Sequence, residues 1–340
     1  MPGIADRPST FTIRGYIMKK MSLFIVFALA AVLFLGQGAH AASTWPDRTV
    51  TMIIPFAAGG TTDVLGRALA NSLSEELGQK FIVKNVSGGN GAVGAAEAAQ
   101  VKPDGYSIAF LPVGPGALMW QQRKIPYDNK SFIPVAQVAA NPTALHVRND
   151  TYKTLKDLIG HLKANPGKVA YGSSGAGSQP HIAGMMLLQA AGVTAKHIPN
   201  TDGATSVKDL LGGVTEFNMN PVTYVDLNDI TALVIFSEER DPKYPNVPSL
   251  KEVGVFPEGS ELPYTETWIG MFVPKGTPKD VITKLEATIE KIMKDPKFIE
   301  VSAKTRQTLK WRNAEDFTKF YDAECAKYNK VLGEAGLLRK

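Results

Sequence analysis

From Thr49 onward, hydrophobic and polar positions follow a repeating order of short apolar strand, glycine-containing loop and amphipathic helix. Strands that alternate with helices in this way are typical of a parallel sheet covered on both faces. The turn at Pro103-Asp104-Gly105 separates the last helix of the first unit from its last strand. The pattern in this part of the chain predicts strands at Val50–Pro55, Phe81–Asn85 and Tyr106–Leu111, and helices at Thr62–Leu77 and Ala92–Gln100.

A second unit of the same kind begins after Val147, and longer helices follow it toward the C-terminus. Open α/β sheets bind ligands beyond the carboxyl ends of their strands, where the glycine loops of both units would lie. Two such units therefore predict two lobes whose loops face each other across a cleft. The predicted elements are helices at Thr154–Ala164 with Thr154 as N-cap, Pro180–Ala191, Ala204–Leu211, Pro278–Lys294 and Ala314–Leu332, and strands at Lys168–Tyr171, Ala195–Ile198, Glu216–Met219 and Trp268–Val273.

The N-terminal segment follows the pattern of an export signal. Lys19-Lys20 precedes an apolar run from Leu23 to Leu35, and Ala39-His40-Ala41 comes just before polar residues. The alternative is a membrane anchor, but thirteen apolar residues fall short of the roughly 20 that a spanning helix needs. We therefore interpret residues 1–41 as a signal peptide cleaved near Ala41, with residues 1–17 compatible with an upstream start codon, and expect a periplasmic protein.

Composition sets the broad class of the protein. With 340 residues, 44% hydrophobic and 20% charged, the chain is long enough for two compact domains. Its formal net charge of +5 falls to +2 without residues 1–41, which is too small for a nucleic-acid-binding surface. Cys325 is the single cysteine, so no intrachain disulfide can form. We expect no nucleic-acid partner.

The loops between strand and helix are the candidate ligand-binding elements. The first runs from Phe56 through Gly59-Gly60 into a helix that opens with Thr61, Thr62 and Asp63. Unpaired N–H groups at such a helix N-terminus favour anions. Residues 55–63, 172–178 and 200–206 contain no Lys or Arg, so a carboxylate there would be held by N–H and hydroxyl groups rather than by a salt bridge. The alternatives are that these small residues only form tight turns and that Asp63 only stabilises the helix dipole.

No motif indicates a cofactor, a metal or a catalytic residue. Residues 89–94 match G-x-G-x-x-G, but the acid expected about 20 residues later is absent, so we interpret them as a tight turn. Residues 57–62 lack the lysine of a P-loop, and residues 172–176 do not fit G-x-S-x-G. Ser174 and His181 lack an obvious orienting acid, and the histidines after residue 41 show no metal-ligand spacing. We therefore predict a binding protein rather than an enzyme.

Several short segments resemble the periplasmic solute-binding proteins of the tripartite tricarboxylate transporter family, the Bug or TctC-like proteins. They occur in family order and extend from Trp45 to about Gly336. Each is weak alone, and together they are specific. They are Trp45-Pro46-Asp47-Arg48, residues 54–63, Pro103-Asp104-Gly105-Tyr106, Ile125-Pro126-Tyr127-Asp128, Tyr171-Gly172-Ser173-Ser174-Gly175, Asp209-Leu210-Leu211-Gly212-Gly213 and Pro274-Lys275-Gly276-Thr277-Pro278.

The resemblance implies a two-lobed periplasmic binding protein fold of the α/β class, type II-like, in which each lobe is a mostly parallel sheet flanked by helices and the ligand lies in the inter-lobe cleft. We place lobe 1 at residues 42–144 plus 264–340 and lobe 2 at residues 145–263. The implied function is capture of a small organic carboxylate by lobe closure and delivery, by a monomer, to integral membrane permease subunits. Carried over by position, the ligand-binding residues are Phe56, Ala57, Ala58, Gly59, Gly60, Thr61, Thr62, Asp63, Ser173, Ser174, Gly175, Ala176, Ser178, Thr201, Asp202, Gly203 and Thr205.

The chain departs from the family pattern in three places, which leaves the ligand open among dicarboxylates, tricarboxylates, amino acids and aromatic acids. Asn200-Thr201-Asp202-Gly203 stands where the family usually has Tyr-Lys-Gly. Residues 221–230 replace a longer segment, and residues 112–116 are unusually rich in proline and glycine. Two other functions stay open from the sequence: an exported α/β hydrolase-type enzyme, and a ligand-sensing component of a membrane receptor.

Overall fold

The computed structural model describes residues 45–339 apart from 227–228 and 258, so the predicted signal peptide at residues 1–41 lies outside the described part. From Trp45 onward, the described residues group as one compact unit. No helix in the described ranges is long and apolar enough to cross a membrane.

The first part of the described chain has the predicted alternation of strand and helix. The predicted strands and helices are present within a few residues of their expected bounds. A long strand, β4, follows them and was not predicted. The elements are β1 (Val50–Ile54), α2 (Thr61–Leu77), β2 (Phe81–Asn85), α3 (Ala92–Gln100), β3 (Ser107–Pro112), α4 (Met119–Gln122) and β4 (Phe132–Arg148).

The second part repeats the alternation and then returns to longer helices. Thr154 caps α5 as predicted, through a reciprocal pair of hydrogen bonds with Asp157. The strands β8 and β10 and the helix α9 were not predicted. The elements are α5 (Leu155–Ala164), β5 (Ala170–Ser173), α6 (Gln179–Ala191), β6 (Lys196–Pro199), α7 (Gly203–Leu211), β7 (Phe217–Pro221), β8 (Ile230–Ile235), β9 (Glu266–Pro274), α8 (Lys279–Ile292), α9 (Pro296–Lys304), β10 (Leu309–Arg312) and α10 (Ala314–Glu334).

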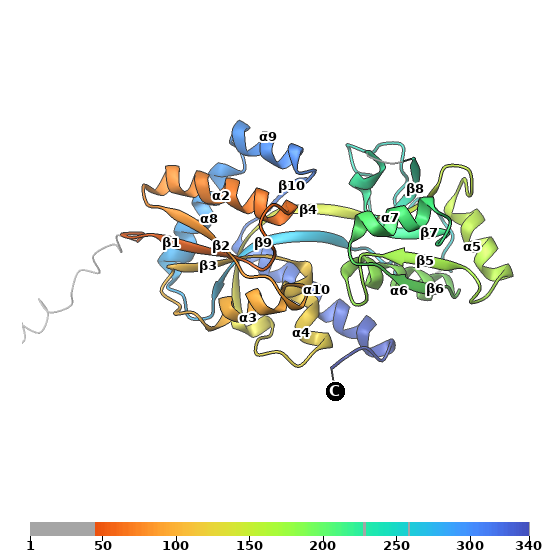
Figure 1. Cartoon of the computed structure of the whole chain (residues 1–340), viewed down its shortest axis with the longest axis horizontal. Coiled ribbons are helices and arrows are strands. Elements are labelled where there is room, and N and C mark those ends of the chain that lie inside the picture. Colours follow the sequence, from red (N-terminus) through yellow and green to blue (C-terminus); the bar gives the residue numbers. More distant parts are fainter. Residues whose placement is uncertain (1–44, 227–228, 258, 340) are drawn as a thin grey trace, which may run out of the picture. The chain divides into compact units, whose positions relative to one another are not determined.

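The strands form one continuous path in the order β2-β1-β3-β9-β4-β7-β5-β6, with β8 and β10 also paired to β4. The predicted parallel pairing is present between β1 and its neighbours β2 and β3, and between β5 and its neighbours β6 and β7. Strands β4 and β9 add antiparallel pairs, so each half of the sheet is mixed rather than purely parallel. Figure 1 shows β4 and β9 crossing between the two halves.

Side-chain alternation along the strands divides the core into layers. In β1, Met52 and Ile54 pack with the apolar faces of α2 and α8, whereas Ile53 faces the opposite layer with α3 and α10. In the second half, α5 and α6 cover one face, where Tyr171 and Phe217 are stacked. Strands buried on both faces fix the strand ends rigidly, and the loops that follow β1 and β5 are carried on those ends.

The strand directions make the loops after β1 and β5 point toward each other. Strand β1 is parallel to β3, β9 reverses the direction, and β4 reverses it again, so β1 and β4 run the same way. Strand β7 is antiparallel to β4 and parallel to β5, so β5 runs the opposite way. The carboxyl ends of β1 and β5 therefore point toward each other along the part of β4 that lies between them, which we call the interval.

Candidate functional site

The first candidate loop joins β1 to α2 and leaves the N-terminus of α2 uncapped. Gly60 occupies the N-cap position with extended backbone (φ −75°, ψ 165°), and no side chain caps the helix. The first intrahelical bond is donated by the N–H of Val64 to the carbonyl of Gly60 at 2.9 Å. The preceding N–H groups, including those of Thr61 and Thr62, have no intrahelical acceptor. With the positive end of the helix dipole, they form a site that favours an anion.

This helix end opens onto a hollow with a volume of about 430 Å³. The volume lies within the range of small-molecule binding sites. The six residues that line it are all predicted ligand-binding residues, namely Phe56, Ala57, Ala58, Gly60, Thr61 and Thr62.

The Asp63 carboxylate fixes the conformation of this loop through hydrogen bonds. Its buried carboxylate accepts hydrogen bonds from the Gly59 N–H (2.9 Å), the Arg67 guanidinium (3.0 Å) and the Asn85 amide (2.8 Å). The same Asn85 amide donates to the carbonyl of Phe56 at 3.0 Å. Burial alone would raise the pKa of Asp63, but these hydrogen bonds lower it below the ordinary 3.8. Both carboxylate oxygens already have partners, which fits the structural alternative for Asp63 better than direct ligand contact.

The second candidate loop, residues 173–178, joins β5 to α6 and is stabilised by hydrogen bonds within the loop and to the first turn of α6. The Ser178 hydroxyl caps α6 by accepting from the His181 N–H (3.3 Å) and donates to the carbonyl of Gly175 (2.7 Å). The N–H of Gly177 donates to Nδ1 of His181 at 3.0 Å. Among the described residues, the N–H groups of Ser174 and Ala176 have no acceptor, so they are the donors that this loop offers to a ligand.

Two histidines support this loop, and the sequence analysis missed their role. The rings of His181 and His197 are stacked with centroids 3.9 Å apart, and Nε2 of His197 lies 2.7 Å from the Ser173 hydroxyl. Burial lowers the pKa of both histidines to about 4. Nδ1 of His181 accepts from Gly177, so this nitrogen cannot serve as a base for Ser174. The arrangement explains the neighbouring serine and histidine without catalysis.

The third candidate region, Thr201–Thr205, already has a carboxylate at its helix N-terminus. Asp202 caps α7 by accepting from the Thr205 N–H (2.8 Å) and from the hydroxyls of Thr201 and Thr205 (3.1 Å each). These hydrogen bonds, led by the one from the Thr205 N–H, lower the pKa of Asp202 below 3.8. The chain's own anion thus occupies the end of α7, in contrast to the uncapped end of α2. This contrast favours the first two loops over Asp202 as contacts for an acid group.

The interval of β4 between the two loops is long enough to hold a ligand. Through the ladder, Ile53 of β1 lies level with Pro134, and Gly172 of β5 lies level with His146. Twelve residues of extended strand span roughly 40 Å, and both loops extend into this distance. A direct contact already crosses the interval, since the Gln122 amide of α4 donates to the carbonyl of Gly177 at 2.9 Å.

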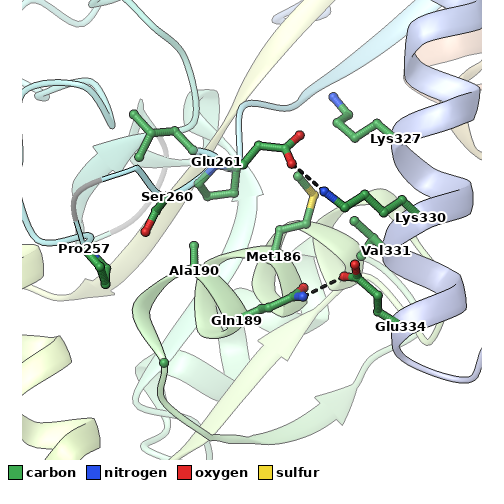
Figure 2. Close-up of a pocket in the computed structure, with 13 residues that line it drawn as sticks. Met186, Gln189, Ala190, Pro257, Ser260, Glu261, Lys327, Lys330, Val331 and Glu334 are labelled. Atoms are coloured by element: carbon green, nitrogen blue, oxygen red, sulfur yellow. Dashed lines mark hydrogen bonds and ion pairs between the residues drawn. The ribbon is translucent and has the colours of Figure 1, made fainter.

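A separate pocket of about 380 Å³ lies between α6, α10 and residues 257 and 260–263. Figure 2 shows that two pairs cross it, Glu261 with Lys330 at 2.7 Å and Gln189 with Glu334 at 2.6 Å. None of the predicted ligand-binding residues lines this pocket. Because its polar groups pair with one another and not with a common centre, it is a weaker candidate for an acid ligand than the loops.

Metal binding has no support in the described ranges, where no group of three or more His, Cys, Asp or Glu side chains is placed to hold an ion.

Comparison with known proteins gives consistent matches over nearly the whole described chain. Residues 65–337 match the family described as tripartite tricarboxylate transporter family receptor. Protein BugT of Bordetella pertussis is 32% identical over 93% of this chain and 99% of its own.

Two solved structures have the same fold. A TctC solute-binding protein from Polaromonas, solved without ligand, is 28% identical, with a TM-score of 0.74 over 85% of this chain and 99% of its own. A protein of R. palustris solved with adipate is 29% identical, with a TM-score of 0.72 over 86% and 98%.

Proposed function

The chain belongs to the tripartite tricarboxylate transporter receptor family, and from this premise we propose that it captures a small organic carboxylate between the loops after β1 and β5. The family consists of binding receptors of transporters, so the predictions of family and of a non-enzymatic role are confirmed. The predicted α/β periplasmic binding protein fold is confirmed as well.

The observation that carries the proposal is the uncapped N-terminus of α2. Its free N–H groups open onto a hollow that contains no basic side chain. A carboxylate fits such a site because oriented backbone dipoles stabilise negative charge without ordering a flexible side chain. The adipate in the R. palustris relative supports a carboxylate as the ligand class.

Closure of two lobes is the mechanism that the strand directions favour. The loops after β1 and β5 face one interval of β4 from opposite ends, so a ligand held by one loop completes its contacts only when the other approaches. The ligand then stabilises the closed state by its additional affinity for that state. We place the lobes at residues 42–144 plus 264–340 and at residues 145–263, with the crossing segments of β4 and β9 as the hinge.

We further propose that the protein works in the periplasm, after cleavage near Ala41, and delivers its ligand to the integral membrane permease subunits of a tripartite transporter. The family assignment and the sequence of residues 1–41 support this proposal.

Thermal unfolding of the purified protein against a panel of organic acids tests the function. Ligand stabilisation follows RT ln(1 + [L]/Kd), so an acid with a Kd of about 10 μM stabilises the fold by about 2.7 kcal/mol at about 1 mM. We expect at least one acid to raise the Tm, and isothermal titration to give saturable heat for that acid without product formation. A panel in which no carboxylate binds would refute the proposal.

A further inference from the structure

The Gln179 side chain is hydrogen-bonded to both strands that cross between the halves of the sheet. Gln179 is the first residue of α6, directly after the loop at residues 173–178, and it is buried. Its amide nitrogen donates to the hydroxyls of Thr265 (2.8 Å) and Thr143 (2.9 Å). Its amide oxygen accepts from the hydroxyls of Thr143 and Thr267 (3.1 Å each). Every hydrogen-bonding position of the amide is thus filled from β4, from β9 or from the residue before β9.

These three threonines lie where β4 and β9 separate. The pairing between the two strands ends at Pro142 and Glu266, and Thr143 of β4 pairs with β7 instead. The N–H of Phe236 donates to the carbonyl of Thr143 (2.8 Å), and the carbonyl of Phe236 accepts from the N–H of Thr265 (2.9 Å). The backbone therefore fixes the positions of the Thr143 and Thr265 hydroxyls beside the segments that we place as the hinge.

The chain of hydrogen bonds continues from Thr265 into α10. The Tyr328 hydroxyl lies 3.2 Å from that of Thr265 and donates at 2.6 Å to the carboxylate of Glu324, which also pairs with Lys327. Because a carboxylate accepts and does not donate, the Tyr328 O–H points to Glu324. Tyr328 then accepts from Thr265, and Thr265 accepts from Gln179. All donors in this chain point the same way, so each bond polarises and strengthens the next.

The chain crosses the proposed boundary between the lobes. Gln179 belongs to lobe 2, whereas its partners on β4, β9 and α10 belong to lobe 1. Water cannot easily replace a lost partner here, because five of these side chains are at most 5% exposed, so a missing hydroxyl leaves its neighbour unsatisfied. The five are Thr143, Gln179, Thr265, Glu324 and Tyr328.

The loop at residues 173–178 depends on α6 for its orientation. Ser178 caps α6 and donates to the carbonyl of Gly175, and the N–H of Gly177 donates to His181 of the first helical turn. The direction of that turn therefore sets where the free N–H groups of the loop point. Gln179 holds the turn at one angle to the crossing strands.

We propose that Gln179 is a positioning residue for ligand capture: through Thr265 and Tyr328 it holds the loop at residues 173–178 at the angle that lets the loop meet an acid bound at α2. This inference rests on the proposed function. A loop that samples more orientations is competent to bind for a smaller fraction of the time, and the apparent affinity falls by that fraction. The simpler alternative is that the network only satisfies buried polar groups and stabilises the fold.

Hydrogen exchange of the ligand-free protein, followed for single amides by NMR, separates these alternatives. Thr265→Val and Tyr328→Phe each remove one hydroxyl at almost constant shape. We expect each to accelerate exchange of the Gly177 N–H at least fivefold relative to the amides of β1, because the opening is local to the loop. The double variant should match Thr265→Val alone, since the chain reaches Tyr328 through Thr265.

Tyr321→Phe is the matched control. Tyr321 is equally buried on α10, and its hydroxyl donates to the carbonyl of Gly116 at 2.9 Å, within lobe 1. This variant should leave exchange of the Gly177 N–H within twofold. Isothermal titration then uses whichever of acetate, succinate, adipate, citrate, glutamate and benzoate raises the Tm of the unaltered protein most. Thr265→Val and Tyr328→Phe should weaken that acid at least threefold, and Tyr321→Phe less than twofold.

Four results would overturn the inference. They are equal acceleration of exchange in the loop and in β1, no difference between Tyr328→Phe and Tyr321→Phe, effects that multiply in the double variant, and faster loop exchange with unchanged affinity. If none of the six acids binds the unaltered protein, the proposed function fails, and a role of Gln179 in capture fails with it. The exchange measurements still show in that case whether the network positions the loop.

Discussion

Replacing Gly60 with aspartate should affect ligand binding at the N-terminus of α2 without destabilising the helix. The backbone of Gly60 is extended, and a Cβ there would meet its nearest neighbour, the carbonyl of Ala57, at 3.7 Å. An aspartate therefore fits without strain and can cap the helix with its own carboxylate. A cap gains a few tenths of a kcal/mol over glycine, and a negative charge at this end of the dipole gains about 0.3–1 kcal/mol. We expect the free energy of unfolding to stay unchanged or to rise by up to about 1 kcal/mol.

The same carboxylate should abolish ligand binding. It would stand about 4 Å from the bound acid, where two like charges repel by about 4 kcal/mol at an effective dielectric constant of about 20. That energy corresponds to a loss of affinity of roughly 1,000-fold. Gly60→Asn is the matched control, since it has the same size and capping ability without the charge. It should weaken binding by about tenfold or less.

Isothermal titration with the tightest acid of the panel measures these affinities, and thermal unfolding without ligand measures stability. The expected result is a stable Gly60→Asp protein with no detectable binding. Retention of affinity within threefold would place the site elsewhere. An equal loss in Gly60→Asn and Gly60→Asp would show that bulk or capping, and not charge, is responsible.

Three further predictions concern the residues that support the site. Asp63→Asn should lower the free energy of unfolding by about 1–3 kcal/mol and weaken ligand binding. In the unaltered protein the Asp63 carboxylate stabilises the fold above its ordinary pKa of 3.8, and this contribution is lost as the pH falls through the lowered pKa of the folded state, which denaturation at a series of pH values measures. The pKa of His181 is about 4 in the folded protein and 6.5 ordinarily, so the unfolded chain takes up the proton first as the pH falls. The free energy of unfolding should therefore fall between about pH 6.5 and about pH 4, and His181→Gln should reduce that slope in the same measurement. Thr154→Ala removes the cap of α5 and should cost about 1 kcal/mol in chemical denaturation while leaving ligand affinity unchanged.

Local sequence patterns predicted the regular units well, because each strand and helix there carries its own signal. The apolar run of β1, the glycines after it and the cap of α5 are all read within a few residues. Strand β4 was missed because Pro134 and Pro142 interrupt it and its alanine-rich stretch has no clear two-residue alternation. It extends over 17 residues because β9, β10, β7 and β8 pair with successive parts of it.

The candidate site was predictable only in part, because contacts between distant parts of the chain leave no local sequence pattern. The residues that line the hollow at α2 all belong to the loop that the strand, glycine and helix pattern marked as a candidate, and the family resemblance named them individually. Their supports come from distant parts of the chain: Asn85 fixes the first loop, Gln122 reaches the second, and His197 lies beneath Ser173. No local pattern links these residues, since Asn85 and His197 are placed by strand pairing and Gln122 by the packing of α4 against α10.

The structure of the protein with its tightest acid bound tests the central claim most directly. The account predicts carboxylate oxygens about 2.7–3.2 Å from the N–H groups of Thr61 and Thr62, with the loop at residues 173–178 closed over the same acid. An acid bound in the pocket between α6 and α10, or anywhere that leaves the N-terminus of α2 open, would contradict it.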